Sequence, residues 1–289
     1  MERKIFEIVP NISEGRDAAI VSEATAAMER AGTRIANKTS DPVHNRSVVT
    51  AFGDAASCLE AAVALAETTT RLIDLRTHSG AHPRIGALDV LPFVPIANAT
   101  LADAATLAHQ AASRIWERVR VPSFYYEAAA NDGKPRLLAE VRRGGFEGLA
   151  HRATRGERPD VGDVVAHPSA GAIAIGARAV LIAFNITLTG GDLALGRRIA
   201  RTLREKDGGL RTLRALGLAL PNGRVQISCN LTEVDAVPLH RIVGLVRRIA
   251  ARSGARVDGC ELIGLVPRRA LAVFVEHALD FEVTTPSSA

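Results

Sequence analysis

Short apolar runs and longer segments with helical spacing alternate along the chain. In the first half, apolar runs bounded by turn residues predict strands at residues 4–9, 33–36, 47–52, 87–96 and 124–126. Helical spacing predicts helices at residues 18–31, 55–74 and 100–119, with a short helical turn at 137–142. The intervening residues 143–163, rich in Gly, Arg and Pro, predict a connector. Strands that alternate with helices predict an α/β sandwich with a mixed sheet.

The second half of the chain has a simpler pattern. Strands are predicted at residues 179–188, 224–230 and 256–263, and helices at 192–205, 239–253, 267–278 and, briefly, near Leu213. This order resembles a ferredoxin-like arrangement. The expected fold class is therefore α/β, with two α/β sandwich subdomains that divide the chain into residues 1–177 and 178–289.

Two polar loops interrupt the apolar pattern of the first half. Residues 77–86, THSGAHPRIG, carry His78, His82 and Arg84 before a strand, and the glycine and proline within this stretch disfavour a helix. Residues 40–46, SDPVHNR, are crowded with hydrogen-bonding side chains. An imidazole beside a guanidinium on a loop suits proton transfer next to an anionic substrate. An isolated HPR triplet is more simply a turn with a surface charge, so the rest of the chain decides between the two interpretations.

The composition excludes some classes of protein. Hydrophobic residues make up 47% of the chain but aromatic residues only 4%, and no apolar run approaches the ~18 residues of a membrane helix. The chain enters a strand-like run directly after Met1, without a signal peptide, and its three cysteines are far apart. These features predict a cytoplasmic globular protein without disulfides. The net charge of +5 is spread along the chain, which fits a small polyanionic substrate better than nucleic acid.

Several common functional motifs are missing from the sequence. No GxGxxG opens a helix after a strand, Gly190-Gly191 lacks the lysine of a phosphate-binding loop, and Ser169 lies in PSAG instead of GxSxG. His78 and His82 have the spacing of a zinc pair, but the glutamate of HExxH is missing. We therefore expect neither a nucleotide site nor a metal site.

Six sequence blocks occur in a fixed order over almost the whole chain. They are VPNISEGRD, SDPVHNRSV, RTHSGAHPRIGALDVLPFVPI, HPSAGAIAIGARAVLIAFNITL, VQISCNLTEVDAVPLHRI and CELIGLVPRRAL. Together they resemble the formiminotransferase family, the glutamate formimidoyltransferases of histidine breakdown. The resemblance implies two α/β subdomains with a substrate channel between them, a homodimer, and transfer of a formimino group from N-formimino-L-glutamate to N5 of tetrahydrofolate. Bifunctional relatives carry an additional cyclodeaminase domain, which is not expected in this chain.

The resemblance also implies which residues form the site. The catalytic histidine of the family falls on His82, in the HPR triplet. The folate-binding segment corresponds to Gly162, Asp163, Val164, Val165, Ala166, His167, Pro168, Ser169, Ala170 and Gly171. Tetrahydrofolate is the implied co-substrate, and neither a metal nor a nucleotide is implied.

The implied chemistry needs two proton transfers and groups that bind carboxylates. A base must take the proton from N5 and an acid must protonate the departing amine, and one imidazole with a pKa near 6.5 can do both in turn. Both substrates carry carboxylates, which arginine binds well. The candidate substrate-binding residues are Asn11, Asp41, His44, Asn45, Arg46 and Arg84. Asp41 is also a candidate to orient His82.

Alternatives stay open at several of these positions. Hydrogen bonds that only join loops explain Asn11, Asn45 and Arg46 about equally well. A tight turn is the alternative for His167 and Ser169.

The chain departs from the family pattern at three places. Ala81 precedes the catalytic histidine where many members have Glu, Thr39 replaces a frequent acidic residue, and Tyr126-Glu127 replaces a Tyr-Gly-Glu sequence. Formyl transfer from N-formyl-L-glutamate and non-catalytic folate binding are therefore alternative functions. A basic nucleic-acid-binding module is a third alternative, which the spread charge and the few aromatic residues disfavour.

Overall fold

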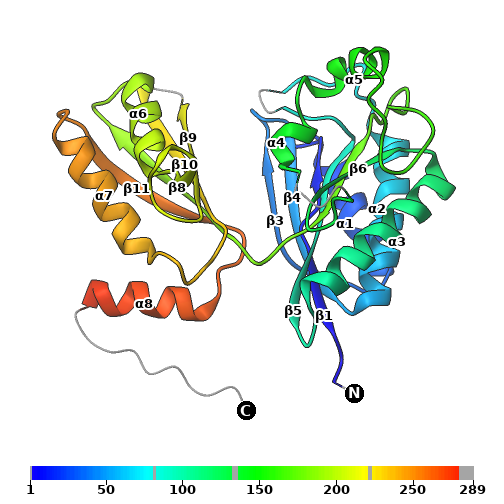
Figure 1. Ribbon diagram of the computed structural model, residues 1–289, viewed down its shortest axis with the longest axis horizontal. Coiled ribbons are helices and arrows are strands. Elements are labelled where there is room, and N and C mark those ends of the chain that lie inside the picture. Colours follow the sequence, from blue (N-terminus) through cyan, green and yellow to red (C-terminus); the bar gives the residue numbers. More distant parts are fainter. Residues whose placement is uncertain (1, 81–82, 132–135, 221–222, 280–289) are drawn as a thin grey trace. The chain divides into compact units, whose positions relative to one another are not determined.

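Two compact units, Met1–Ala179 and Val180–Ala289, make up the computed structural model of the chain (Figure 1). The structure describes residues 2–80, 83–131, 136–220 and 223–279. Each unit has its own β-sheet and its own hydrophobic core. Among the described residues, no helix is both long and apolar enough to cross a bilayer. The α/β fold class with two sheets, predicted from the sequence, is confirmed.

The first unit is built on a mixed sheet. Its strands are β1 (Ile5–Ile8), β2 (Asn11–Ile12), β3 (Arg34–Asp41), β4 (Arg46–Gly53), β5 (Leu88–Ala97), β6 (Ser123–Glu127) and β7 (Ile173–Ala177). The order is β1-β4-β2-β5-β7-β6, and β3 pairs with the free side of β4. The short strand β2 lies between β4 and β5, where Asn11 pairs with Val48 on one side and Val90 on the other. The pairs β5–β7 and β6–β7 are parallel and the others are antiparallel, as expected for a mixed sheet.

Helices cover both faces of this sheet. The helices α1 (Ala18–Arg30), α2 (Ala55–Leu72) and α3 (Leu101–Val119) pack on one face, mainly through alanines and aliphatic side chains (Figure 1). Asp17 caps α1, and Thr100 forms a capping box with Asp103 at the start of α3. The short helices α4 (Leu138–Val141) and α5 (Gly145–Thr154) close a second cluster with buried side chains of β5, β6 and β7.

The second unit has the order strand, helix, two strands, helix, strand. Its elements are β8 (Ile182–Thr189), α6 (Leu193–Leu203), the 3-10 turn η1 (Glu205–Asp207), β9 (Leu213–Ala219), β10 (Val225–Leu231), α7 (Leu239–Ala251), β11 (Arg256–Ile263) and α8 (Arg268–Leu279). The antiparallel sheet has the order β11-β8-β10-β9, which is compatible with the expected ferredoxin-like arrangement. Residues Phe184, Ile186 and Leu188 enter the core, while the residues between them face away from it.

Strand β3 ends at Asp41 instead of residue 36, and the short strand β2 was not predicted. Four further details of the predicted pattern are wrong. The short helix expected near Leu213 is strand β9, because Leu213 and Ala215 alternate with exposed residues and pair with β10. Leucine, alanine and arginine favour helices locally, and the pairing overrides that preference. The connector expected at 143–163 contains α5, whose start is fixed by a 2.7 Å bond from the Phe146 amide to the Arg84 carbonyl.

The other two details concern the end of the first unit. Strand β8 begins at Ile182 and not at residue 179. The apolar run just before it is a separate strand, β7, which was not predicted as one. Strand β7 was not predicted because its alanines and glycine are not typical of strands. Close packing explains the glycine, since a Cβ at Gly176 would come within 3.0 Å of atoms of the Tyr126 ring.

Two other glycines with similar backbone conformations provide a test of close backbone packing. Gly171 has φ 71° and a Cβ there would lie under 3.0 Å from the Ile85 carbonyl oxygen, whereas Gly156 has φ 79° and open space around it. Gly156→Ala should lower the free energy of unfolding by about 1–2 kcal/mol, the cost of the left-handed conformation. Gly171→Ala should cost about 1–3 kcal/mol more, because the backbone must move. Urea unfolding of both variants measures the difference, and equal losses would contradict the close approach.

Candidate functional site

Residues of the first three sequence blocks pack against one another. A Cβ on Gly15 would lie under 3.0 Å from backbone atoms of Asp41 and Arg46. A Cβ on Gly80 would come equally close to the carbonyl oxygen of His44. Only glycine allows such an approach of one backbone to another. Segments that are far apart in the sequence therefore form one surface.

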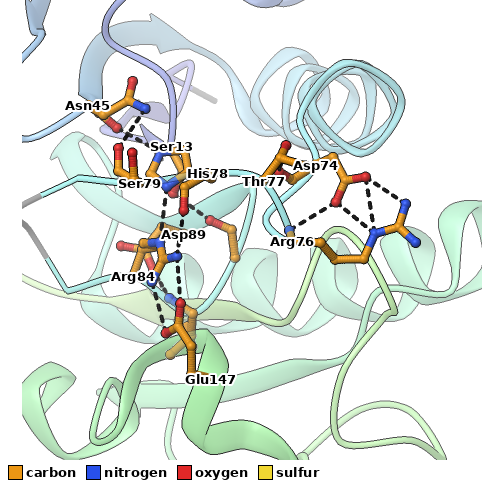
Figure 2. Close-up of polar contacts among 12 residues, drawn as sticks. Ser13, Asn45, Asp74, Arg76, Thr77, His78, Ser79, Arg84, Asp89 and Glu147 are labelled. Carbon is orange, nitrogen blue, oxygen red and sulfur yellow. Dashed lines mark hydrogen bonds and ion pairs between the residues drawn. The ribbon is translucent and has the colours of Figure 1, made fainter.

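Asn45 joins these segments by hydrogen bonds. Its side chain is nearly buried, and its φ of 48° is in the left-handed region that asparagine tolerates. The Asn45 Oδ1 accepts from the Gly15 amide at 2.9 Å. The Asn45 Nδ2 donates to the Ser79 carbonyl at 3.0 Å (Figure 2). Asn45 thus joins the loops, and its predicted contact with substrate stays a prediction.

The loop at residues 77–86, which contains the HPR triplet, is called the HPR loop below. Its residues His78 and Arg84 form a chain of polar contacts with Glu147 (Figure 2). The Arg84 Nε donates to His78 Nδ1 at 3.1 Å, and the Arg84 guanidinium forms two further bonds to the carboxylate of Glu147 on α5, at 3.0 and 2.7 Å. Since Nδ1 accepts, the neutral ring carries its proton on Nε2, which donates to the Asn45 carbonyl at 3.2 Å. Arg84 therefore joins His78 to Glu147 of α5, and its predicted role as a substrate anchor stays a prediction.

Burial and the neighbouring Arg84 set the protonation states of His78 and Glu147. It lowers the pKa of His78, and the nearby Arg84 guanidinium lowers it further against the opposing bond to the Asn45 carbonyl. The pKa of Glu147 is also lowered, chiefly because Arg84 donates to its carboxylate. His78 is therefore a neutral imidazole beside a permanent cation at neutral pH.

Asp41 and His44 form a pair at the tip of the β3–β4 hairpin. The Asp41 Oδ2 and the His44 Nδ1 are 2.5 Å apart, and Oδ1 accepts from the amides of Val43 and His44 at 2.8 and 2.9 Å. Burial raises the pKa of Asp41, but these bonds outweigh it and the net pKa is lowered. Asp41 therefore orients His44. Its predicted action on His82 stays a prediction, because His82 lies outside the described residues.

A buried aspartate connects the surface to the interior of the sheet. Asp89, on β5, is completely buried, and its Oδ1 accepts from the Ile85 amide at 2.8 Å. Its Oδ2 is 3.0 Å from Nη1 of Arg46 and also accepts from Nη2 of Arg142. Arg46 in turn donates to Oδ1 of Asn11, whose Nδ2 donates to the Val9 carbonyl at 2.8 Å. Asn11 and Arg46, two of the predicted substrate-binding residues, thus belong to one network.

The predicted folate segment lies beside the strand that follows the HPR loop. His167 and Gly171 exchange backbone hydrogen bonds of 2.7 and 3.0 Å, and His167 Nδ1 accepts from the Ala170 amide at 3.1 Å. The tight turn considered for His167 is therefore present, and burial lowers the pKa of its ring. The carbonyl of Ser169 accepts from the Leu75 amide at 2.8 Å, and that of Ala170 from the Ala87 amide at 2.9 Å.

This segment leaves surface that a ligand could contact. The exposed residues within it are Asp163, Val164 and Pro168, while Val165 enters the core and Gly162 rests on the Trp116 ring. The backbone is ordered by contacts with its neighbours before any ligand binds. Such pre-formed backbone is compatible with the predicted folate site, which stays a prediction.

A groove of about 770 Å³ lies elsewhere, among α1, α2 and α3. It is lined by charged side chains that pair across it, such as Glu67 with Arg118 at 2.6 Å and Glu60 with Arg114. None of the predicted site residues that the structure describes lines it. Within the described residues, no group of three or more His, Cys, Asp or Glu side chains is arranged to hold a metal ion.

Sequence reasoning missed Asp89, Arg142 and Glu147 as members of the site. A signal for Asp89 was present, since it is the single charged residue in the apolar run of residues 85–96. Arg142 and Glu147 gave no local signal, because only the tertiary fold brings α4 and α5 to the strand ends.

Both units match family descriptions in comparisons with known proteins. Residues 5–178 match the "Formiminotransferase domain, N-terminal subdomain", and residues 183–283 match the "Formiminotransferase domain". The chain belongs to the formiminotransferase family. The resemblance drawn from the six sequence blocks is thereby confirmed.

Curated relatives in this family are similar over nearly the whole chain. The glutamate formimidoyltransferase of Streptococcus pyogenes serotype M1 is 38% identical, and the alignment covers 96% of this chain and 94% of that protein. The enzyme of the same name from Thermoplasma acidophilum is also 38% identical, with 96% and 92% covered. The formimidoyltransferase-cyclodeaminase of Rattus norvegicus is 34% identical, and the alignment covers 93% of this chain and 51% of the rat protein.

The neutral state of His78 predicts a pH dependence of stability. Because its folded pKa is lowered, the unfolded chain binds more protons below the unfolded value of about 6.5, and the free energy of unfolding should fall between pH 7 and pH 5. His78→Gln should make this fall smaller. Urea unfolding at both pH values measures it, with His151→Gln, at an exposed position of α5, as the control. An unchanged pH dependence in His78→Gln would mean that His78 is protonated as readily in the folded state.

Proposed function

We propose that this formiminotransferase-family protein is a glutamate formimidoyltransferase that moves the formimino group of N-formimino-L-glutamate to N5 of tetrahydrofolate. The observation that carries the proposal is the convergence of the family segments, since described residues of the loops at 11–16, 40–46, 77–80 and 83–87 pack together and residues 85–87 adjoin the predicted folate segment. The products are N5-formiminotetrahydrofolate and L-glutamate. Membership of the family and the similarity to named glutamate formimidoyltransferases support it.

The reaction forms one C–N bond and breaks another. N5 bonds to the formimino carbon and loses a proton, and the bond from that carbon to the glutamate nitrogen breaks as the nitrogen gains a proton. No net proton is consumed, so one imidazole can take the first proton and deliver the second. His82, by its place in the HPR triplet, is the proposed group.

His44 is proposed as a second group for proton transfer. The Asp41 carboxylate pairs with its Nδ1, in the way that a third group orients the base in many enzymes with a catalytic imidazole. Its backbone lies directly against Gly80, two residues before His82 in the sequence. The pair therefore stands beside the HPR loop in the fold.

The proposal includes several properties that the family resemblance supports. Tetrahydrofolate is the co-substrate, with the segment from Gly162 to Gly171 as its site. The protein acts in the cytoplasm as a homodimer, its two units being the two formiminotransferase subdomains. Light scattering of the purified protein tests the dimer.

Turnover with alternative donors tests the reaction. Purified protein with tetrahydrofolate should release L-glutamate from N-formimino-L-glutamate with a kcat/KM at least about tenfold above that for N-formyl-L-glutamate. A tenfold difference in kcat/KM needs only about 1.4 kcal/mol of difference in transition-state binding. Glutamate release matched by consumption of tetrahydrofolate is the measurement. A preference for the formyl donor, or folate binding without turnover, would replace the proposal with one of the alternatives.

His82→Asn should lower kcat/KM by about 10²–10⁴-fold, the usual loss when a proton-transfer group is removed. Binding of tetrahydrofolate should largely survive, because the ring acts on protons and not on affinity. His151→Asn is the matched control and should keep normal turnover. Normal turnover in His82→Asn would rule out His82 as the base.

His44→Ala should lower kcat by about 10²-fold, the lower end of the range for such groups. Added imidazole should restore part of the activity, because a free ring can enter the space left at this partly exposed hairpin tip. The same addition should not affect the wild type or His151→Ala. A loss that imidazole cannot restore, together with a lower melting temperature, would leave His44 a purely structural role.

A further inference from the structure

The Asp89 network carries an excess of positive charge. Arg46 and Arg142 both bond to the same oxygen of Asp89, and these three side chains together carry a net charge of +1. Burial, and the neighbouring Arg142, lower the pKa of Arg46 to about 10, which leaves it protonated at neutral pH. Asp89 keeps its charge, since the two guanidiniums outweigh the effect of its burial and its pKa is lowered.

Among the described residues, part of the Arg142 guanidinium has no hydrogen-bond partner. Arg142 gives Nη2 to Asp89, its Nε is buried without an acceptor, and no described residue accepts from its Nη1. An uncompensated buried charge is costly, and a hydrogen-bond donor left without a partner adds to that cost. Both guanidiniums keep an exposed edge, 13% of the side chain for Arg142 and 15% for Arg46. A cation held in place by a buried acid, with open donors at its edge, is suited to an anionic ligand.

We infer that Arg142 and Arg46, held by Asp89, bind a carboxylate of the glutamyl donor. The planar fork of arginine matches the two oxygens of a carboxylate, and the net charge of +1 matches a single carboxylate better than a phosphate dianion. This inference rests on the proposed function. It adds Arg142 as a substrate-binding residue and Asp89 as the residue that positions both guanidiniums.

The position of the network favours the donor over the folate tail. The Ile85 amide, which bonds to Asp89, is three residues after His82, so the network adjoins the loop that carries the proposed base. In N-formimino-L-glutamate the α-carboxylate lies only a few bonds from the reacting carbon. The glutamyl tail of folate is separated from N5 by most of the length of the molecule. A carboxylate held here therefore places the donor's reacting carbon near the HPR loop.

The test compares two neighbouring arginines. Arg142→Gln removes the proposed ligand, and Arg143→Gln removes an exposed charge next to it in the sequence. Calorimetric titration should show that Arg142→Gln binds N-formimino-L-glutamate and L-glutamate about 10- to 100-fold more weakly, the loss expected for one charged hydrogen-bonded contact. Affinity for tetrahydrofolate should change less than about threefold, and Arg143→Gln should bind all three like the wild type.

Each other outcome overturns the inference. Glutamate binding unaffected by Arg142→Gln, an equal loss in Arg143→Gln, or a loss confined to tetrahydrofolate would each remove Arg142 from the donor site. If Arg142→Gln does not fold, Arg142→Lys, which keeps the charge but loses the fork, should show a weaker form of the same loss, and its absence would also overturn the inference. Because L-glutamate binding needs no turnover, failure of the proposed reaction in the wild type would be recognised separately.

Discussion

The two ion pairs of Asp89, with Arg46 and with Arg142, are the interactions on which the candidate site depends. Asp89 lies on β5, Arg46 begins β4 and Arg142 ends α4, while Asn11 of β2 and the Ile85 amide complete the network. A buried charge must be paired, and removing one partner of a buried pair typically costs about 3–5 kcal/mol. The network therefore fixes the relative positions of distant segments at the strand ends, where the polar loops emerge.

The protonation states of the site follow from the same burial. His78 and His167 are both shifted toward the neutral ring by burial, while Arg46 stays charged in spite of it. A neutral imidazole beside a fixed cation, as His78 is beside Arg84, forms an environment that attracts anionic substrates and still contains a group able to accept a proton. Acid–base chemistry on a substrate with several carboxylates needs this combination.

The sequence was informative about elements and motifs but not about their partners. Periodicity located most strands and helices because burial on one face imposes the spacing that was measured. It failed at β9, where local helix preference competed with strand pairing, and at α5, where glycines suggested a connector. The loops that carry Asn45, His44 and Arg84 were found because polar residues cluster there. Their actual contacts were not, since Arg84 meets Glu147 across 63 positions of sequence and only the fold brings them together.

Asp89 illustrates the limit most clearly. A single aspartate in an apolar strand indicates a buried partner, but the sequence contains many arginines and does not say which of them supplies it. The glycines at positions 15 and 80 are similar, because close packing of one backbone on another leaves no pattern that a single sequence reveals.

A crystal structure of the protein with N-formimino-L-glutamate would test the central claim most directly. The bound donor should have one carboxylate within hydrogen-bond distance of the Arg142 and Arg46 guanidiniums, with Asp89 still bonded to both, and its formimino carbon directed toward the HPR loop. A donor bound with its carboxylates away from these arginines, or with Asp89 released from them, would contradict it.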